Sequence, residues 1–449
     1  MVAGVTVEQV AEAGIVGAGG AGFPTHVKLK AQVDTVVLNG AECEPLLHKD
    51  KEILKHFPEE VMAGLACAKE LVGARRAVVG VKGKYHDVID TLRKQLPTWA
   101  EIAPLTDSYP SGDEFILVYD TLGRLIPPGG IPLVVGAVVI NVETALNLAK
   151  AAAEPVIEKF LTVAGAVRQP VTVRVPIGAS IGHCVELAGG ATTDRPCYFL
   201  GGVMMGRVTT DPATLVDKTL GAVIVLPQDH PLAQRYLQTW KQIVRIGRSA
   251  CDQCGYCTQF CPRWLLGHPI EPHRAMRSLG FNLVGQSDVA GTVFCCECNV
   301  CSLYACPEDL DPKNVCAENK RRLLAEGKRW QNAPFDQMRP RLHLADRRIP
   351  IDRLIHKLGL QRFRNEGHLI EKRPALERVG IPLKQHAGAP CEPIVRVGQA
   401  VTKGQVLGRP PVVSGKPALG APVHASVDGV VSAIENGIVW IKLQTQSAR

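Results

Sequence analysis

The chain has 449 residues, of which 46% are hydrophobic, and a formal net charge of +8. This length allows about three domains with cores of their own. A nucleic-acid partner is disfavoured, because the basic stretch 320–378 has few interleaved aromatic residues and no recognition motif. We interpret that stretch as a solvated surface facing an acidic partner. The longest apolar run, 131–142, is too short and too broken by Pro132 for a membrane span.

The cysteines and the N-terminus bear on the compartment. Fifteen cysteines would indicate a secreted disulfide scaffold only in a much shorter chain. Eight of them fall in two short runs and the others are scattered, which favours a reducing, cytoplasmic compartment. Glu8 and Glu12 precede the first lysine or arginine, Lys28, and this order argues against a signal peptide.

A glycine-rich loop follows the first expected helix, at residues 7–14. Gly17, Gly19 and Gly22 satisfy G-x-G-x-x-G, but a dinucleotide fingerprint needs a strand before the loop and a helix after it. Here a helix precedes the loop and a proline follows. The loop is therefore either a backbone that approaches a flat ring or a phosphate, with Lys28 as a cation, or a flexible surface segment.

Strand-like and helical segments alternate next, which implies parallel strands with helical crossovers. Strands are expected at 34–38 and 76–81 and directly after Glu114, and helices at 60–72 and 86–95. Ligands bind beyond the carboxyl ends of such strands. The polar loops are therefore candidate site edges, although each alone could be an ordinary turn. These loops span 39–45, 109–114, 127–130 and 141–144.

Residues 159–230 predict another unit. The alternating stretch 161–176 indicates a hairpin that turns at Gln169 and Pro170, and a helix is expected over 181–188. Gly201 and Gly202 either let the backbone approach a cofactor or form a simple turn at a strand end. A helix over 231–246 leads from this unit into the cysteine runs, which are separated by a helix at 269–279.

The two cysteine runs have the spacing of a two-cluster ferredoxin, C-x2-C-x2-C-x3-C-P and C-x2-C-x2-C-x4-C-P. In such ferredoxins the fourth cysteine of each run crosses to the other cluster. One [4Fe-4S] cluster is therefore assigned to Cys251, Cys254, Cys257 and Cys306, and the other to Cys261, Cys295, Cys298 and Cys301. Zinc sites pair C-x2-C arms from separate hairpins, so zinc and disulfides are disfavoured.

The other seven cysteines are not expected to be ligands. Cys296 and Cys316 are spare, since only one residue separates Cys296 from Cys298. The remaining five lie in apolar stretches and are expected to be small core residues, namely Cys43, Cys67, Cys184, Cys197 and Cys391.

The last 70 or so residues are β-rich, with short strands punctuated by glycine turns, which indicates a small sandwich or barrel. This unit resembles the barrel-sandwich hybrid of biotinyl and lipoyl carriers. Its hairpin at 426–429 reads Ser-Val-Asp-Gly, without the lysine that a carrier modifies. A docking module is therefore favoured over a swinging arm.

Three stretches resemble the NADH- and FMN-binding subunit of respiratory complex I, namely 17–28, 39–45 and 141–144. The same set, with 109–112 and 127–130, resembles the C subunit of the Rnf electron-transport complex. In that subunit the barrel-sandwich module precedes the flavin domain, whereas here it comes last. This order is similar to that of the cobalamin reductases of bacterial propanediol-utilisation microcompartments.

The resemblance implies a multidomain α/β protein. Its four domains would be a Rossmann-like FMN/NADH domain, a β-grasp (SLBB) domain, a helical two-[4Fe-4S] ferredoxin-like domain and a C-terminal all-β barrel-sandwich hybrid. The expected bounds are 1–155, 156–232, 233–335 and 376–449, with a basic linker at 336–375.

The resemblance also implies cofactor-binding residues. FMN would be held by Gly17, Gly19, Gly20, Lys28, Asn39, Gly112, Asn141 and Thr144. The nicotinamide nucleotide would be approached by Phe23, Glu44 and Glu114, and Gly22, Glu42 and Asp113 complete the cofactor-binding set. Ala41 stands where complex I has an Asp that bonds the flavin, which implies weaker nucleotide affinity.

The implied function is that of an NADH-dependent iron–sulfur flavoprotein. Electrons would pass from NADH through FMN and two [4Fe-4S] clusters to cobalamin, taking cob(III)alamin to cob(II)alamin and cob(I)alamin. The expected partners are an adenosyltransferase and a shell protein, in the cytoplasm inside a bacterial microcompartment. Two alternatives are an Rnf-like NADH:ferredoxin subunit and a non-enzymatic electron conduit docked to a shell protein.

Overall fold

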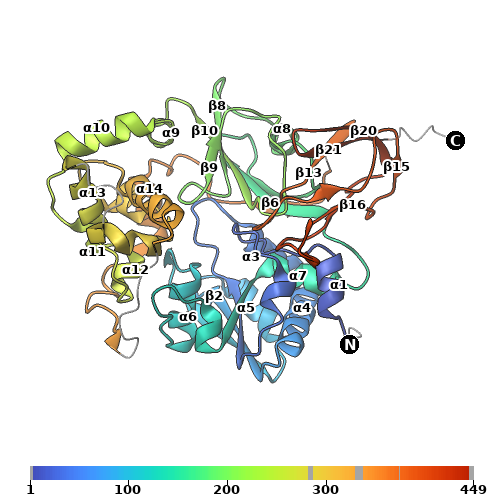
Figure 1. The fold of residues 1–449 in the computed structure, drawn as a ribbon, viewed down its shortest axis with the longest axis horizontal. Helices are drawn as coiled ribbons and strands as arrows, with labels where there is room; N and C mark the ends of the chain where they lie inside the picture. The colour runs from blue at the N-terminus through green and yellow to red at the C-terminus, as the bar shows by residue number, and fades with distance from the viewer. Residues whose placement is uncertain (1–3, 282–286, 329–336, 374, 444–449) are drawn as a thin grey trace.

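The computed structural model describes residues 4–281, 287–328, 337–373 and 375–443. In Figure 1 the blue and cyan N-terminal region lies below a green sheet, which is flanked by the yellow and orange helices and by the red C-terminal strands. None of the helices in these ranges combines the length and apolar character needed to cross a bilayer.

The N-terminal region is built on a parallel sheet of four strands. β1 (Thr35–Gly40) lies between β2 (Arg76–Lys82) and β5 (Ala137–Asn141), and β3 (Ala100–Leu105) forms the edge beyond β2. The chain builds outward from β1 to β3 and then crosses back to place β5 on the other side of β1. The expected alternation of strands and helices therefore does produce a parallel sheet.

Helices cover both faces of this sheet, and successive side chains of β1 serve the two faces in turn. Val36 packs in the core that contains α4 (Pro58–Leu71) and α7 (Val142–Lys150), whereas Val37 packs in the core that contains α6 (Glu114–Leu122). The region also contains α1 (Val7–Glu12), α2 (Thr25–Lys28), α3 (Lys49–His56), α5 (His86–Arg93), the short strand β4 (Ser108–Tyr109) and the 3-10 helix η1 (Pro132–Val135).

Helix α6 replaces the strand that we expected directly after Glu114. Residues 115–119 read Phe-Ile-Leu-Val-Tyr, a run with strand propensity. Asp113 caps the segment as a helix, because its Oδ1 accepts hydrogen bonds from the backbone N–H groups of Phe115 (3.0 Å) and Ile116 (3.3 Å). Gly123 ends the helix in the left-handed conformation. The expectation of a strand was wrong because these end signals outweigh intrinsic propensity.

The second region is a six-stranded sheet in the order β12-β7-β6-β10-β8-β9. β6 (Glu158–Gly165) and β7 (Val171–Pro176) are antiparallel, so the stretch does form the expected hairpin around residues 169 and 170. The sheet packs against α8 (Ile181–Leu187). Its other strands are β8 (Pro196–Leu200), β9 (Arg207–Thr209), β10 (Ala222–Pro227) and β12 (His368–Ile370).

Residues 336–375, which we expected to be a basic linker, contain ordered elements that join other regions. β11 (Ile349–Pro350) pairs with β4 of the N-terminal region, and β12 pairs with β7 of the second sheet. Between them, α15 (Ile351–Lys357) buries its apolar face in a core shared with Phe199 and Leu303. The basic residues of this segment therefore belong to a part of the chain that is packed against other regions.

The cysteine-rich region is helical. The single helix expected over 231–246 is divided into α9 (Pro231–Tyr236) and α10 (Trp240–Ala250), because Thr239 forms a capping box with Gln242 and starts a new helix. The other elements are α11 (Tyr256–Gln259), α12 (Pro262–Leu265), α13 (Pro272–Gly280), the 3-10 helix η2 (Ser287–Phe294), the π-helical turn η3 (Cys301–Ala305) and α14 (Pro312–Ala325).

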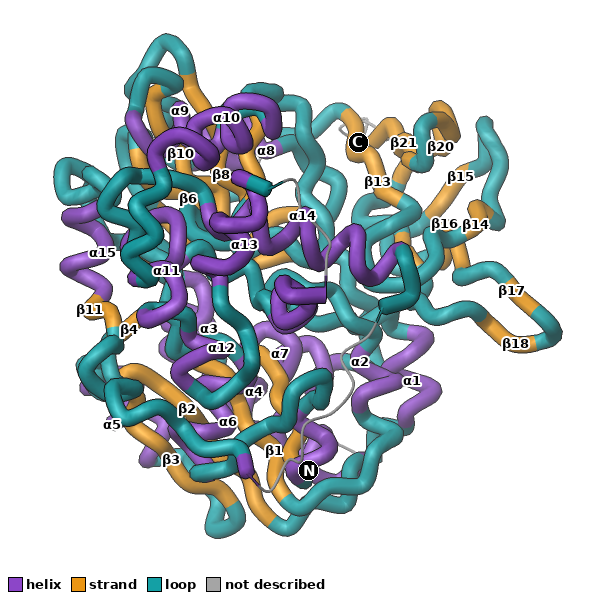
Figure 2. The backbone as a smooth tube through the Cα atoms, turned by 60° about the vertical axis from the view of Figure 1, so that its left-hand side comes forward, coloured by secondary structure: helices purple, strands orange, loops and turns teal. Residues whose placement is uncertain are grey.

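The C-terminal region is all β, as expected. One sheet has the order β13-β21-β20-β15 and another has the order β14-β16-β19. Figure 2 shows the β17–β18 hairpin projecting from this region. The strands are β13 (Arg378–Pro382), β14 (Glu392–Pro393), β15 (Ala400–Val401), β16 (Val406–Arg409), β17 (Val412–Val413), β18 (Lys416–Pro417), β19 (Val423–His424), β20 (Gly429–Glu435) and β21 (Ile438–Leu443).

Lys218 is a buried residue whose hydrogen bonds join three regions. Its Nζ donates to the carbonyl oxygens of Gly14 (2.7 Å) and Pro422 (2.8 Å), and its backbone N–H donates to Gln385. Burial lowers the pKa of Lys218 to about 7, and the nearby Cys391 thiol opposes that shift. The second region is therefore anchored to both the N-terminal segment and the C-terminal barrel by one amine.

We expect Lys218→Met to change how stability depends on pH. Between pH 7 and 10.5 the unfolded chain keeps the Lys218 proton while the folded chain releases it, so this residue makes stability rise with pH. The thermal midpoint of the wild type minus that of Lys218→Met should therefore increase as the pH is raised from 7 to 10. Lys94→Met, at an exposed position, is the control. Parallel pH profiles for all three proteins would contradict the lowered pKa.

Candidate functional site

A cavity of about 450 Å³ lies at the carboxyl ends of β1 and β5. Asn39 of β1 and Asn141 of β5 face each other in the parallel register, and both line the cavity. These two strands flank the point where the strand order reverses, because the chain leaves β1 in one direction and returns to its other side. Such a reversal leaves a crevice at the carboxyl ends of the strands, where ligands bind in open α/β sheets.

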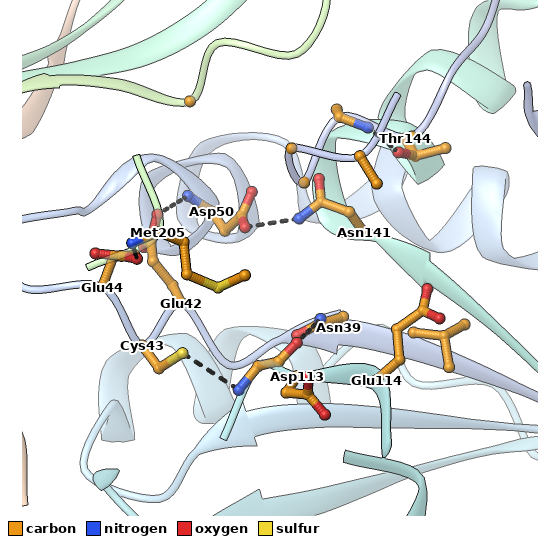
Figure 3. Close-up of a pocket in the computed structure, with 18 of the residues that line it drawn as sticks. Asn39, Glu42, Cys43, Glu44, Asp50, Asp113, Glu114, Asn141, Thr144 and Met205 are labelled. Atoms are coloured by element: carbon orange, nitrogen blue, oxygen red, sulfur yellow. Dashed lines mark hydrogen bonds between the residues drawn. The ribbon is translucent and has the colours of Figure 1, made fainter. Parts of the chain in front are cut away.

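The cavity brings together thirteen of the fourteen residues predicted to bind cofactors. They are Gly17, Gly19, Gly20, Phe23, Lys28, Asn39, Glu42, Glu44, Gly112, Asp113, Glu114, Asn141 and Thr144. Figure 3 labels some of them, namely Asn39, Glu42, Glu44, Asp113, Glu114, Asn141 and Thr144. Gly22 is not among the lining residues. Its carbonyl accepts a hydrogen bond from the backbone of Ala387 (2.9 Å), so Gly22 joins the loop to the C-terminal region instead.

The glycine-rich loop is held in a defined shape. The Gly17 N–H donates to the carbonyl of Phe23 (2.9 Å), and the Ala18 N–H donates to Oγ1 of Thr144 (3.0 Å). Gly20 has a φ of 116°, and the space beside its Cα is open. A side chain there would be strained and would project from the loop, so glycine keeps the backbone accessible.

The facing asparagines hold the loops of the cavity in place. Nδ2 of Asn39 donates to the carbonyl of Gly112 (2.8 Å), which fixes the loop before α6. Nδ2 of Asn141 donates to Asp50 (2.7 Å), and its Oδ1 accepts from the Glu143 N–H (2.9 Å) at the start of α7. Each amide thus joins the end of its own strand to a neighbouring loop or helix beside the cavity.

Lys28 supplies a cation to the cavity. Its Nζ donates to Oε1 of Glu114 (3.1 Å) and to the carbonyl of Val139 (2.9 Å). The side chain is about one-quarter exposed, which leaves the ammonium accessible to a ligand. A cation beside an open glycine backbone is suited to an anionic group.

Two carboxyl groups of the loop after β1, the buried Glu42 and the partly buried Glu44, hold neighbouring segments. Glu42 accepts hydrogen bonds from the backbone of Asp50 (2.8 Å) and Lys51 (3.1 Å) in the first turn of α3. Glu44 accepts from the backbone of Met204 and Met205 (2.9 Å each) in the second region. Burial raises the pKa of both carboxyl groups to about 7, and Asp50 also raises that of Glu42.

Gly202 makes the contact of Glu44 possible. An added Cβ at Gly202 would lie 2.5 Å from Cδ of Glu44. Gly201, its neighbour, lines the cavity and has open space beside its Cα. Backbone approach to the cavity, one of the two roles left open for these glycines, fits Gly201. Close packing against Glu44, which was not among the expected roles, explains Gly202.

A buried ionic cluster forms part of the cavity wall, since Lys49 and Asp50 line the cavity, and sequence reasoning missed it. Lys49 pairs with Asp50 (2.5 Å) and Glu143 (3.1 Å), and Glu143 also pairs with Lys159. These groups are almost completely buried, and buried charges persist only when they are paired. Glu143 belongs to the Asn-Val-Glu-Thr stretch and could have been suspected, but its lysine partners come from distant segments.

Arg263 reaches the cavity from the cysteine-rich region. Its guanidinium forms a bidentate pair with Asp113 and lies 3.7 Å from the ring centroid of Phe115. Arg263 follows Cys261 and Pro262 in the chain, so the pair links a cysteine run directly to the cap of α6. The sequence offered no signal for this partnership beyond the position of the arginine after Cys-Pro.

Three further residues connect the cavity with the cysteines. Cys296 lines the cavity, and the hydroxyl of Tyr109, which also lines it, donates to the carbonyl of Cys298 (2.7 Å). Cys43 lines the cavity too, and its Sγ accepts from the Gly112 N–H (3.3 Å). The expectation that Cys43 is a simple core residue was wrong, whereas Cys67, Cys184, Cys197 and Cys391 are buried as expected.

The first predicted set of cluster cysteines surrounds a small cavity of about 20 Å³, which is lined by Cys251, Cys254, Cys257 and Cys306. No three His, Cys, Asp or Glu side chains of the described ranges are arranged to hold a single metal ion. A cubane spreads its thiolates around a cluster instead of converging them on one ion. Four cysteines around a common cavity fit that arrangement.

The second predicted set is also gathered in one place. Cys261, Cys298 and Cys301 are buried. Burial raises the pKa of the Cys301 thiol, and Cys295, Cys261, Cys257 and Asp311 raise it further, so Cys301 has neighbours from both predicted sets. The two spare cysteines adjoin this set, because Cys316 neighbours Cys295 and Cys296 neighbours Cys298.

Four family matches agree with these features. Residues 10–150 match the Nuo51 FMN-binding domain, 160–208 the SLBB domain, 250–311 the 4Fe-4S dicluster domain and 357–447 the RnfC barrel sandwich hybrid domain. They confirm the predicted fold class and the prediction of FMN and [4Fe-4S] cofactors. The fold and the site thus define an oxidoreductase that uses a flavin and iron–sulfur clusters.

Similarity to curated proteins identifies the family. The chain is 42% identical to cobalamin reductase PduS of Salmonella typhimurium, over 97% of this chain and 95% of that protein. It is also 42% identical to cobalamin reductase PduS of Citrobacter freundii, over 97% and 96% of the two chains. The chain therefore belongs to the PduS cobalamin reductase family, and the predicted resemblance is confirmed.

A more distant relative matches part of the chain. It is the C subunit of the Na(+)-translocating ferredoxin:NAD(+) oxidoreductase complex of Acetobacterium woodii, which is 34% identical over 57% of each chain. The resemblance to the Rnf complex is thereby confirmed.

We expect Arg263→Met to destabilise the protein by about 3 kcal/mol, because it leaves Asp113 buried without its cation. Arg124→Met is a matched control, since Arg124 forms a comparable pair with Asp34 that is exposed to solvent. That control should cost less than about 1 kcal/mol. Urea unfolding of the two variants measures both effects. Equal losses in the free energy of unfolding would show that the Arg263 pair stabilises the protein no more than the exposed pair does.

Proposed function

We propose that this chain is an NADH-dependent cobalamin reductase. It passes electrons from NADH through FMN and two [4Fe-4S] clusters to cobalamin, taking cob(III)alamin to cob(II)alamin and then to cob(I)alamin. The observation that carries the proposal is the shared wall between the cavity and the second cysteine set, where Cys296 lines the cavity and Tyr109 bonds to the backbone of Cys298. The names of the family's relatives supply the acceptor.

The cavity residues have distinct roles in this proposal. FMN is held by Gly17, Gly19, Gly20, Lys28, Asn39, Gly112, Asn141 and Thr144. Phe23, Glu44 and Glu114 contact the nicotinamide nucleotide, while Glu42 and Asp113 position the loops around it. Gly22 acts from outside the cavity through its bond with Ala387.

The eight cysteines of the two sets are the cluster ligands in this proposal. Cys251, Cys254, Cys257 and Cys306 hold one cluster, and Cys261, Cys295, Cys298 and Cys301 hold the other. The flavin and the clusters supply the conversion of hydride chemistry to single-electron transfer, while the protein supplies distance and orientation. Arg263 maintains that distance by joining the flavin cavity to the second cysteine set.

The wider setting is proposed with the same function. We place the enzyme in the cytoplasm, inside a bacterial microcompartment, with an adenosyltransferase as the consumer of cob(I)alamin and a shell protein as a docking partner. We retain the proposed domain bounds of 1–155, 156–232, 233–335 and 376–449. Membership in the PduS family supports this setting.

We expect Lys28→Gln to weaken FMN binding about tenfold, because the variant loses one charge-assisted contact to an anionic cofactor. Lys30→Gln is the matched control, since Lys30 is exposed and does not line the cavity. Titration of the apoprotein with FMN, followed by flavin fluorescence, measures both affinities. Similar affinities for the two variants would remove Lys28 from the FMN site.

The main test mixes anaerobic, reconstituted protein with NADH and cob(III)alamin and follows the corrin spectrum. We expect the flavin to bleach and the corrin to be reduced. If the flavin bleaches and the corrin does not change, the cobalamin assignment fails, and a ferredoxin acceptor as in the Rnf-like alternative is favoured. If NADH fails to bleach the flavin while dithionite reduces the clusters, the protein is an electron conduit.

The cluster assignment has its own test. We expect about eight irons per chain in the wild type and about four in Cys257→Ser, because that variant loses one four-iron cluster. Cys316→Ser should retain all of its iron, since Cys316 lies beside the second set but is not assigned as a ligand. Iron analysis and electron paramagnetic resonance of the reduced proteins measure this. Loss of iron from Cys316→Ser would overturn the ligand set.

A further inference from the structure

An open groove of about 650 Å³ lies beside the cysteine runs. None of its lining residues also lines the flavin cavity. It is formed by α11, η3 and α15 and by the segment before β11. We call it the α15 groove and define it by Tyr256, Phe260, Tyr304, Arg347, Arg353 and Lys357. Its volume is in the range of small-molecule sites, about 300–1,000 Å³.

The aromatic floor of the groove is joined to the cluster cysteines through the chain. Tyr256 directly precedes Cys257, Phe260 directly precedes Cys261, and Tyr304 is two residues before Cys306. The rings of Phe260 and Tyr304 meet edge to face with centroids 5.5 Å apart. A flat ligand on this floor would therefore lie beside residues that carry ligands of both clusters.

The rim of the groove is cationic. The exposed face of α15 presents Asp352, Arg353, His356 and Lys357, which recur at helical spacing. Arg347 adds a guanidinium 4.5 Å from the ring centroid of Phe260. Three permanent cations thus face one carboxylate within the groove.

The surroundings reduce the charge of the rim only in part. Lys357 lies 3.6 Å from Asp309, but Asp309 is also paired with Arg235 at 3.0 Å. Arg347 hydrogen bonds with the neutral side chain of Gln259 (3.1 Å). Two cations sharing one carboxylate leave an excess of positive charge, which favours an anionic group on the ligand.

We propose that the α15 groove binds the corrinoid acceptor, with the phosphodiester on the arginine and lysine side chains and an edge of the macrocycle on the aromatic floor. This inference rests on the proposed function, which supplies the acceptor. Arginine and lysine bind phosphate oxygens through charge-assisted hydrogen bonds, and aromatic rings offer faces and edges to a flat ligand. A shallow groove suits a ligand too large to be enclosed.

The test compares two double charge reversals in the reconstituted holoprotein. Arg353→Glu with Lys357→Glu alters the groove, and Lys241→Glu with Arg245→Glu is the matched control. The control residues are also exposed, have the same four-residue spacing on α10 and lie outside the groove. We expect the KM for cob(III)alamin with NADH to rise roughly tenfold in the groove variant and less than about twofold in the control.

Further measurements separate binding from electron supply. The rate of flavin bleaching by NADH and the iron content should match the wild type in both variants. Cobinamide, which lacks the phosphodiester, should be used poorly by the wild type and should show no additional loss in the groove variant. An equal KM for cob(III)alamin in all proteins, or an equal rise in both variants, would overturn the groove assignment.

The two proposals can fail separately. Corrin reduction that is unaffected by the groove variant leaves the proposed function intact and removes the groove. If the wild type does not reduce cob(III)alamin, the proposed function fails, and equilibrium dialysis with cob(III)alamin then decides on the groove alone. No binding, or equal binding by the wild type and the groove variant, overturns it. Selective loss of transfer to an acidic ferredoxin would reassign the groove to a protein acceptor.

Discussion

The buried pair between Arg263 and Asp113 is the interaction on which the arrangement of the site depends. Asp113 caps α6 and lines the cavity that we propose for FMN, while Arg263 lies two residues after a predicted cluster ligand. Two charges removed from water are stable only with good geometry, and this pair has a bidentate contact and an aromatic face beneath it. The pair thereby fixes the position of the flavin region relative to the cysteine region, as electron transfer between them requires.

The sequence predicted the parts of the site that depend on local pattern. The alternation of strands and helices was sufficient for the parallel sheet, and the polar loops after β1 and β5 did meet at one crevice because parallel neighbours end at the same edge. It failed for the segment 114–122, where a cap at Asp113 decided between helix and strand. It also placed Cys43 in a core, since a pattern does not reveal that a loop turns its cysteine toward a cavity.

The interactions between regions could not be predicted from local pattern. Glu44 lines the cavity, and its carboxylate also accepts hydrogen bonds from the backbone of Met204 and Met205, which lie about 160 residues further along the chain. Lys159 and Lys218 are long polar side chains in apolar strands or loops, and only the fold supplies their partners. Residues of this kind become recognisable when the packing of one region on another is known.

The position of the barrel at the end of the chain can be reconciled with its position at the start of the Rnf protein that the chain resembles. Figure 1 shows the C-terminal strands close to α1, and Arg409 of β16 forms a bidentate pair with Glu12 (2.8 Å). Ala387 bonds to Gly22 of the glycine-rich loop, and Lys218 joins Gly14 to Pro422. The barrel therefore packs on the N-terminal segment, and these contacts do not require either module to come first in the chain. The module order therefore changes the connection while the packing that supports the flavin loop can stay the same.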